Sequence, residues 1–233
     1  MKLSKVESRK DMLIKAIEQL QGHKECIYDD AYKCVKNLGA NFNIVVIGGI
    51  HGDEPAGICA ALELFAKEYP ASQMLTIIPC ANPTGYTRNT RENGKGEDIN
   101  RQFDDDRLQA EERVLRDIVG QADVLITLHE DDVHDGCYVY APKTHANIGK
   151  GTLNAMSKHV PAFAGDIVFN DPSNKGLITN FDKENPKHVR SVEGFGKKMG
   201  VPSFCLEVPK DQGFNARVSA LRDGALHIIR IFQ

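Results

Sequence analysis

Short apolar runs alternate along this chain with longer segments in which apolar residues recur every three or four positions. The apolar runs predict strands over residues 43–49, 74–80, 123–128, 137–141, 166–169 and 203–208. The segments with helical spacing predict helices over residues 8–20, 55–68, 105–120, 148–159, 187–199 and 214–232. This alternation is typical of an α/β fold in which helices cover both faces of a sheet.

One stretch follows neither pattern. Between Asn82 and Phe103 the chain is polar and rich in glycine, and we expect a long loop there. Long loops inside compact domains often carry function. The 233 residues are 41% hydrophobic, which is enough for one large core, and no linker interrupts them. We therefore expect residues 1–233 to form a single domain.

Charge and composition narrow the classes of partner. The net charge is -3, and no stripe of Lys and Arg with aromatic residues between them occurs, so we expect no nucleic-acid partner. Residues 1–7 lack the apolar core of a secretory leader, and no apolar run is long enough to span a bilayer, which predicts a cytoplasmic protein without a membrane partner. The 6 cysteines form no C-x-x-C pair, so we expect thiols rather than disulfides.

Two predicted strands lead into a histidine. The strand at 43–49 is followed by His51 and, three residues later, by Glu54, while the strand at 123–128 is followed by His129. An α/β sheet places its ligands at the edge where its strands end, so these three side chains are expected to converge. Two histidines and one glutamate with an open fourth position make a catalytic zinc set. The sequence therefore predicts one zinc ion and a metal-dependent hydrolase.

Such a reaction also needs a base and cationic groups. Glu207 places a carboxylate within the apolar strand at 203–208, and we predict that it is the general base; the alternative is a strand-end carboxylate that points to solvent. Arg91 and Arg101, in the predicted loop, carry planar guanidinium groups. These groups suit either a clamp on a substrate carboxylate or the stabilisation of a developing oxyanion.

In these residues and their order, the chain resembles the zinc metallocarboxypeptidase superfamily: His51-x-x-Glu54, Asn82-Pro83-Thr84-Gly85, Asn100-Arg101, His129 and Glu207. The resemblance runs from about Gly48 to Pro209. It implies a mixed, mostly parallel twisted sheet of about eight strands with helices on both faces, which agrees with the alternation above. It also implies that His51, Glu54 and His129 bind zinc and that Glu207 is the general base.

Residues 91–103 carry the most specific part of this resemblance. They are similar to the R-x-N-x-x-G-x-D-[LI]-N-R-x-F stretch of the murein tripeptide amidase branch. The resemblance implies that Arg91 polarises the scissile carbonyl and that Asn100 and Arg101 hold the free carboxylate of the substrate. Arg88 is a second candidate for either role.

The chain also departs from part of the superfamily. His51-Gly52-Asp53-Glu54 is similar to the amidase and deacylase branches, whereas secreted digestive carboxypeptidases usually carry Arg before the ligand Glu. Those enzymes place a mobile Tyr before the catalytic Glu, but no Tyr follows Tyr140 here. Three residues remain open as its replacement: Phe181, Lys183 and His188.

Two hydrolase functions agree with these residues. The first is a carboxypeptidase or amidase that acts on a small peptide with a free carboxylate. The second is a deacylase of N-acyl amino acids, as in the succinylglutamate desuccinylase and aspartoacylase branch. A nucleotide-binding module is disfavoured, because neither G-x-G-x-x-G nor G-K-[ST] follows the strand at 43–49. We assign the apolar face of residues 214–232 to the core, so no dimer interface is predicted from it.

Overall fold

The computed structural model describes residues 8–104, 110–180 and 186–233. Its main sheet has eight strands in the order β1-β2-β4-β3-β5-β10-β6-β9. They are β1 (His23–Tyr28), β2 (Ala31–Lys36), β3 (Phe42–Gly48), β4 (Gln73–Ile78), β5 (Val124–Asp131), β6 (Tyr138–Tyr140), β9 (Leu177–Ile178) and β10 (Ser203–Pro209). The four central strands β4, β3, β5 and β10 are parallel. Strand β2 pairs in antiparallel fashion with both β1 and β4, and β6 pairs in antiparallel fashion with β10. The predicted mixed α/β sheet is thereby confirmed.

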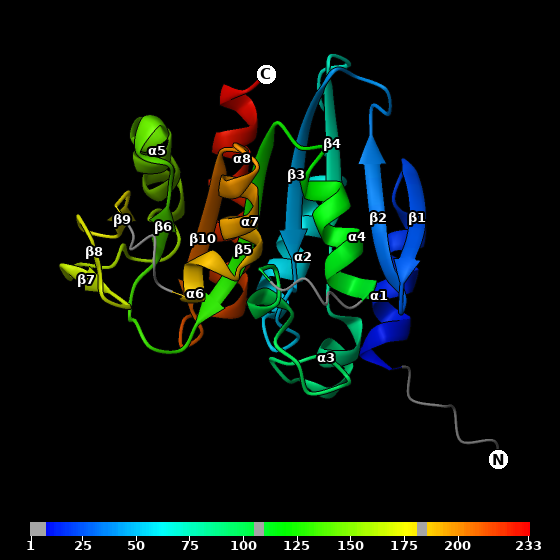
Figure 1. Ribbon diagram of the computed structural model, residues 1–233, viewed down its shortest axis with the longest axis horizontal. Helices are drawn as coiled ribbons and strands as arrows, with labels where there is room; N and C mark the ends of the chain where they lie inside the picture. Colours follow the sequence, from blue (N-terminus) through cyan, green and yellow to red (C-terminus); the bar gives the residue numbers. More distant parts are fainter. Residues whose placement is uncertain (1–7, 105–109, 181–185) are drawn as a thin grey trace.

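Helices cover both faces of this sheet (Figure 1). On one face, apolar residues of four helices pack with the sheet into the larger core cluster: α1 (Arg9–Gln19), α2 (Pro55–Phe65), α5 (Ala146–Met156) and α8 (Phe214–Ile231). On the other face, a second cluster joins the sheet to α4 (Ala110–Val119) and α7 (Val192–Lys198). The apolar side of α8 lies in the larger cluster, as the sequence predicted.

Strand β5 lies at the centre of the sheet and is buried along its whole length. Its alternate residues enter opposite clusters, since Ile126 and Leu128 belong to the larger one and Leu125 to the smaller one. This alternation follows from the period of two of a β-strand. Residues 127, 129 and 131 consequently share the face of Leu125, and His129 lies near the end of β5, at the carboxyl edge of the sheet.

The structure differs from the predicted elements where local signals are weak. The β1–β2 hairpin was not predicted, because its first strand is an exposed edge without regular alternation of burial. The predicted strand at 166–169 shortens to β7 (Ile167–Val168), which pairs with β8 (Asp171–Pro172) in a separate two-stranded sheet. The predicted helix at 187–199 is divided into α6 (Pro186–Val189) and α7, because Ser191 caps the second helix.

Two further differences concern the predicted loop and the predicted helix at 105–120. The loop contains α3 (Pro83–Arg88) and the 3-10 turn η1 (Ile99–Arg101), while a second 3-10 turn, η2 (Lys143–His145), precedes α5. Helix α3 begins with the Asn82 side chain accepting from the Gly85 amide, a local capping signal. Of the helix predicted at 105–120, residues 105–109 lie outside the described residues.

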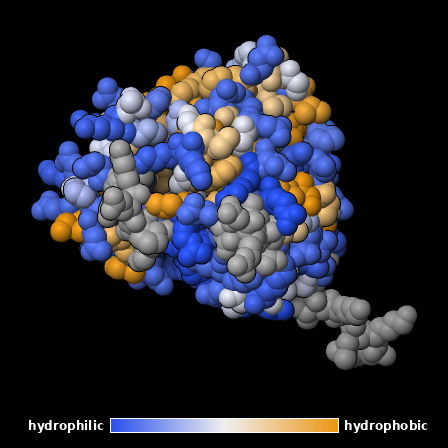
Figure 2. Space-filling view, in the orientation of Figure 1, coloured by the Kyte–Doolittle hydropathy of each residue, from blue (hydrophilic) through white to orange (hydrophobic). Residues whose placement is uncertain are grey.

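In the part of the chain that the structure describes, no helix is both long and apolar enough to cross a membrane. On the face drawn in Figure 2, hydrophilic residues predominate and hydrophobic residues form small separate groups, apart from the atoms drawn in grey. This surface agrees with a sheet whose apolar sides are covered by helices.

The turn between β3 and α2 packs closely against α3. A Cβ atom added at Gly52 would overlap backbone atoms of Gly85 and Tyr86, whereas one added at Gly213 would meet nothing within 4 Å. We expect Gly52→Ala to lower the free energy of unfolding by about 1–3 kcal/mol, because neither backbone can move without displacing its helix. Urea denaturation measures this change. Gly213→Ala is the matched control, and equal stability of the two variants would contradict the close contact.

Candidate metal centre and active site

Three buried side chains converge at the carboxyl edge of the sheet. His51 lies in the turn after β3, Glu54 is the N-cap of α2, and His129 lies on β5. The Glu54 carboxylate lies between the two rings, with 2.7 Å from Oε1 to His51 Nδ1 and 3.0 Å from Oε2 to His129 Nδ1. The ligand atoms of the three residues all lie within 4.8 Å of one another. The structure thus brings together the three residues that the sequence singled out.

This donor set suits a divalent cation. Two imidazole nitrogens and one carboxylate oxygen are the ligands of many catalytic metal sites. Burial opposes ionisation of Glu54, but the two neighbouring histidines hold its pKa well below its ordinary value. The carboxylate is therefore ionised and able to bind a cation, and we name this group, His51, Glu54 and His129, the ligand set.

The turn that carries His51 and Glu54 is attached to β5 through Glu130. Its carboxylate accepts a hydrogen bond of 2.7 Å from the amide of Ala56, in the first turn of α2, and forms an ion pair with Arg217 of α8. Because Glu130 follows His129 directly, one strand holds both a ligand and the helix that carries another. The relative positions of Glu54 and His129 are fixed in this way.

Each histidine also has a carboxylate at its second ring nitrogen. Asp98 Oδ1 lies 3.4 Å from His51 Nε2, and Glu193 Oε1 lies 3.2 Å from His129 Nε2. Sequence reasoning assigned no role to either acid. The signal for Asp98 is its place in the segment 91–103, two residues before Asn100, whereas Glu193 is an ordinary acidic residue in the first turn of a helix.

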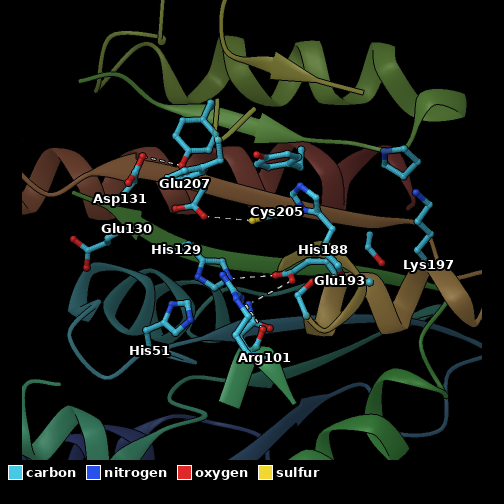
Figure 3. A pocket seen from close by; sticks show the side chains of 18 of the residues that line it. His51, Arg101, His129, Glu130, Asp131, His188, Glu193, Lys197, Cys205 and Glu207 are labelled. Carbon is cyan, nitrogen blue, oxygen red and sulfur yellow. Dashed lines mark hydrogen bonds and ion pairs between the residues drawn. The ribbon is translucent and has the colours of Figure 1, made fainter. Parts of the chain in front are cut away.

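Glu207 lies beside His129 in the neighbouring strand. In the parallel pair β5–β10, the two residues stand directly opposite each other, and both side chains enter the same cavity. Figure 3 shows the Glu207 carboxylate above the ring of His129, with the Cys205 thiol 3.7 Å from its Oε1. Burial raises the pKa of Glu207 to about 8, and the nearby Glu54 carboxylate adds to the increase. The structure thus places a titratable carboxyl group next to the ligand set.

The predicted arginines occupy different positions. Arg91 lies beside the ligand set, since its Nε donates to Asp98 Oδ2 at 2.9 Å and its Nη1 is 3.9 Å from Glu54 Oε1. Arg101 is partly buried in the cavity wall, with Nη1 donating to the Asn100 carbonyl. Arg88, at the end of α3, is exposed and donates to the Gly94 carbonyl, and it is not part of the cavity wall.

Asn100 is largely engaged by α7. Its side-chain oxygen accepts a hydrogen bond of 2.8 Å from the Val192 amide, and its nitrogen lies 3.5 Å from Glu193 Oε2. The buried amide therefore joins the 3-10 turn η1 to the first turn of α7. One face of Asn100 still borders the cavity.

The cavity has a volume of about 960 Å³ and continues from the ligand set along β10. Beyond Glu207 its wall includes Cys205 and Ser203 on β10 and two tyrosines, Tyr138 and Tyr140, on the neighbouring strand β6. The hydroxyl groups of these tyrosines donate to Asp131 at 2.9 Å and to Asp171 at 3.1 Å. No Tyr follows Tyr140 in the chain, but the sheet brings Tyr138 and Tyr140 to the site from β6.

One of the three candidates for the missing mobile tyrosine is placed by the structure. His188 borders the cavity, with Nε2 2.7 Å from Asp171 Oδ2. Phe181 and Lys183 lie outside the described residues.

The family model of the succinylglutamate desuccinylase/aspartoacylase catalytic domain matches residues 41–230. No curated protein matches the chain. Solved structures show the fold. A protein from Shewanella denitrificans that is assigned as a metallopeptidase has a TM-score of 0.79 and 24% identity, over 94% of this chain and 87% of that chain.

Two further structures are more distant. A metallo-carboxypeptidase from Burkholderia cenocepacia has a TM-score of 0.69 and 15% identity, over 96% of this chain and 69% of that chain. The cell shape determinant protein Csd4 from Helicobacter pylori, bound to a tripeptide, has a TM-score of 0.66 and 14% identity, over 86% of this chain and 55% of that chain. The family match confirms the resemblance identified in the sequence, and the structures confirm a carboxypeptidase-like fold.

The ligand set predicts binding of one divalent cation per chain. We expect metal-free protein to bind zinc with a stoichiometry of one and to gain thermal stability, because a ligand that binds only the folded state stabilises it. His129→Ala should lose most of this affinity, as it removes one of three donors. Isothermal titration calorimetry measures both quantities. His159→Ala, whose ring pairs with Asp223 on the surface, is the control, and equal affinity of both variants would contradict the assignment.

Proposed function

The chain belongs to the succinylglutamate desuccinylase/aspartoacylase catalytic-domain family, and we propose on that basis that it is a zinc-dependent hydrolase that cleaves an amide bond in a small substrate with a free carboxylate. The observation that carries the proposal is the position of Glu207, which stands opposite His129 in the sheet with its carboxylate in the same cavity as the ligand set. A base at that place can activate a water molecule next to the metal. We also propose that the chain forms one catalytic domain, which the match over residues 41–230 supports.

The proposed mechanism assigns one task to each group. When bound by His51, Glu54 and His129, zinc supplies a Lewis acid that lowers the pKa of water and polarises a carbonyl. Glu207 accepts a proton from the attacking water and returns it to the leaving nitrogen. Without a metal, the pKa of Glu207 is raised. A cation bound nearby would lower this pKa again and favour the ionised carboxylate that the step needs.

Two arginines complete the mechanism. Arg91, whose guanidinium lies beside the ligand set, donates to the carbonyl oxygen of the scissile amide as negative charge develops on it. Arg101 binds the free carboxylate of the substrate from the cavity wall, since a guanidinium group pairs with a carboxylate through two parallel hydrogen bonds. Asn100 lies beside Arg101 and borders the cavity, so its side-chain amide can contact the same substrate carboxylate.

The size of the cavity favours a peptide substrate. About 960 Å³ lies near the upper end of the usual range for small-molecule sites, and the cavity continues well past the ligand set along β10. A peptide fragment fills this length better than a single acylated amino acid. The resemblance of the fold to a tripeptide-bound structure agrees with this choice. We therefore propose a carboxypeptidase or amidase activity.

A second function is favoured by the family match. The family is named for a desuccinylase and an aspartoacylase, so a deacylase of N-acyl amino acids is the alternative. Both reactions hydrolyse an amide close to a carboxylate, and both use the same base, arginines and metal ligands. They differ only in what lies on the far side of the scissile bond.

The activity is tested with zinc-loaded protein and a mixture of C-terminally free dipeptides, a murein tripeptide and N-acyl amino acids. We expect the wild type to consume a peptide, as followed by mass spectrometry. Glu207→Gln should retain zinc and lose about 10²- to 10⁴-fold in rate, since it removes the base and keeps its shape. Consumption of N-acyl amino acids alone would select the deacylase, and normal turnover by the variant would refute the role of Glu207.

The carboxylate clamp is tested with a pair of arginines. Arg101→Met should lower kcat/KM by about 30- to 1,000-fold, because loss of a paired charge in a binding site costs about 2–4 kcal/mol. Arg88→Met, which removes an exposed arginine outside the cavity wall, should leave kcat/KM within twofold. If steady-state kinetics gave the opposite order, the clamp would have to be assigned to Arg88.

A further inference from the structure

Glu193 lies in the first turn of α7, but its side chain extends away from the helix toward β5 (Figure 3). The side chain is only 17% exposed. Its Oε1 accepts a hydrogen bond of 2.6 Å from the Thr127 hydroxyl and lies 3.2 Å from His129 Nε2, while its Oε2 lies 3.5 Å from the Asn100 amide nitrogen. Partners from two elements, β5 and η1, therefore hold this carboxylate in one orientation.

The two ring nitrogens of His129 face different partners. Nδ1 points to Glu54 and the ligand set, whereas Nε2 points to Glu193. A neutral imidazole has one N–H and one lone pair, and an ionised carboxylate only accepts hydrogen bonds. Both nitrogens face ionised carboxylates, so both can carry a proton in the protein alone. A cation at the ligand set would replace the proton on Nδ1, whereas Nε2 would keep its N–H directed at Glu193.

From this geometry we propose that Glu193 is a positioning residue for the metal ligand His129. It accepts the hydrogen bond of Nε2–H, fixes the ring in its plane and holds the tautomer that presents Nδ1 to the cation. Carboxylates in this position raise the basicity of a ligand histidine and strengthen metal binding. The inference rests on the proposed metal centre but makes no use of the substrate.

The alternative role for Glu193 is that of a metal ligand. Ligand atoms of His129, Glu193 and Cys205 also lie within 4.8 Å of one another and could hold a second cation. That arrangement requires both nitrogens of His129 to act as donors at once, which a neutral imidazole with one lone pair cannot do. Oε1 of Glu193 already accepts from the Thr127 hydroxyl. The hydrogen-bonding pattern therefore favours a positioning role.

Glu193 also links the two histidines through η1. Asp98, the N-cap of this turn, lies 3.4 Å from His51 Nε2, and Asn100, within the turn, approaches the Glu193 carboxylate that faces His129. Asn100 is fixed in turn by the Val192 amide, which precedes Glu193 on α7. The turn and its N-cap thus lie next to both ligand histidines, and Asn100 acquires a positioning task toward Glu193 besides the substrate contact implied by the resemblance.

The test is the affinity of the full chain for cobalt(II) and zinc, without substrate. Glu193→Ala should weaken zinc binding by about 10- to 100-fold and shift the d–d absorption of the cobalt protein, because the ring of His129 is no longer fixed. Glu193→Gln should recover most of the affinity, since its side-chain carbonyl can still accept from Nε2–H. Thr127→Val should have a smaller effect in the same direction.

Two controls separate this role from a loss of folding. Glu63→Ala removes an exposed glutamate of α2 that pairs with Arg222, and Thr152→Val removes a buried hydroxyl that donates to Ile148 within α5. Neither should change metal affinity. The thermal stability of the metal-free variants shows whether Glu193→Ala folds, and Glu193→Gln gives the answer if it does not.

Several outcomes would overturn the proposal. Unchanged zinc affinity and an unchanged cobalt spectrum in Glu193→Ala would do so even if the wild type hydrolyses peptides. Two cobalt ions per chain, with a sulfur-to-cobalt band that Cys205→Ser removes, would make Glu193 a ligand instead. If the wild type bound no divalent cation, the proposed function would fail with it. If zinc affinity depended on Glu193 as proposed but the zinc-loaded wild type turned over no substrate, the proposed function alone would be refuted.

Discussion

An excess of negative charge, buried at Glu54 and half-buried at its neighbours, is the constraint on which the site at the carboxyl edge of the sheet depends. Four carboxylates, those of Glu54, Asp98, Glu193 and Glu207, surround the two histidines of the ligand set, and the two arginines beside them are Arg91 and Arg101. With neutral histidines, the carboxylates outnumber the guanidinium groups by two. Unpaired charges away from water are costly, so such a group is stable only if a cation is present or protons are taken up. The raised pKa of Glu207 corresponds to the uptake of a proton, and a divalent cation at the ligand set is the other solution.

The fold resists this repulsion because rigid elements hold every acid. Glu207 and His129 stand on adjacent parallel strands in the middle of the sheet, Glu54 begins a helix whose next amide is bound by Glu130, and Glu193 lies in a helix capped by Ser191. Elements packed through two apolar clusters cannot relax by moving apart without losing their cores. The apolar packing on both faces of the sheet therefore sustains the arrangement of charges at its edge.

The parts of this site that the sequence predicted are those that depend on local pattern. Buried strands such as β3 and β5 are continuous apolar runs, and the histidines that follow them are visible without knowledge of the fold. The edge strand β1 and the short helix α3 were not predicted, since an exposed edge has little apolar signal and six residues give little periodicity. Glu193 was missed for a different reason. It is 64 residues from His129, and only the packing of α7 on the sheet brings the two together.

The distribution of charge along the cavity constrains where a substrate can lie. Arg91 lies beside the ligand set, and Arg101 lines the same cavity. The rest of the wall includes Ser203 and Cys205 of β10, the two tyrosines of β6, and two lysines, Lys143 and Lys197. The tyrosine hydroxyls donate to Asp131 and Asp171, and these hydrogen bonds orient both rings in the cavity wall. The guanidinium groups beside the ligand set would attract a substrate carboxylate. In the proposed reaction the scissile bond would then lie close to that carboxylate, and the remainder of the substrate would extend along β10.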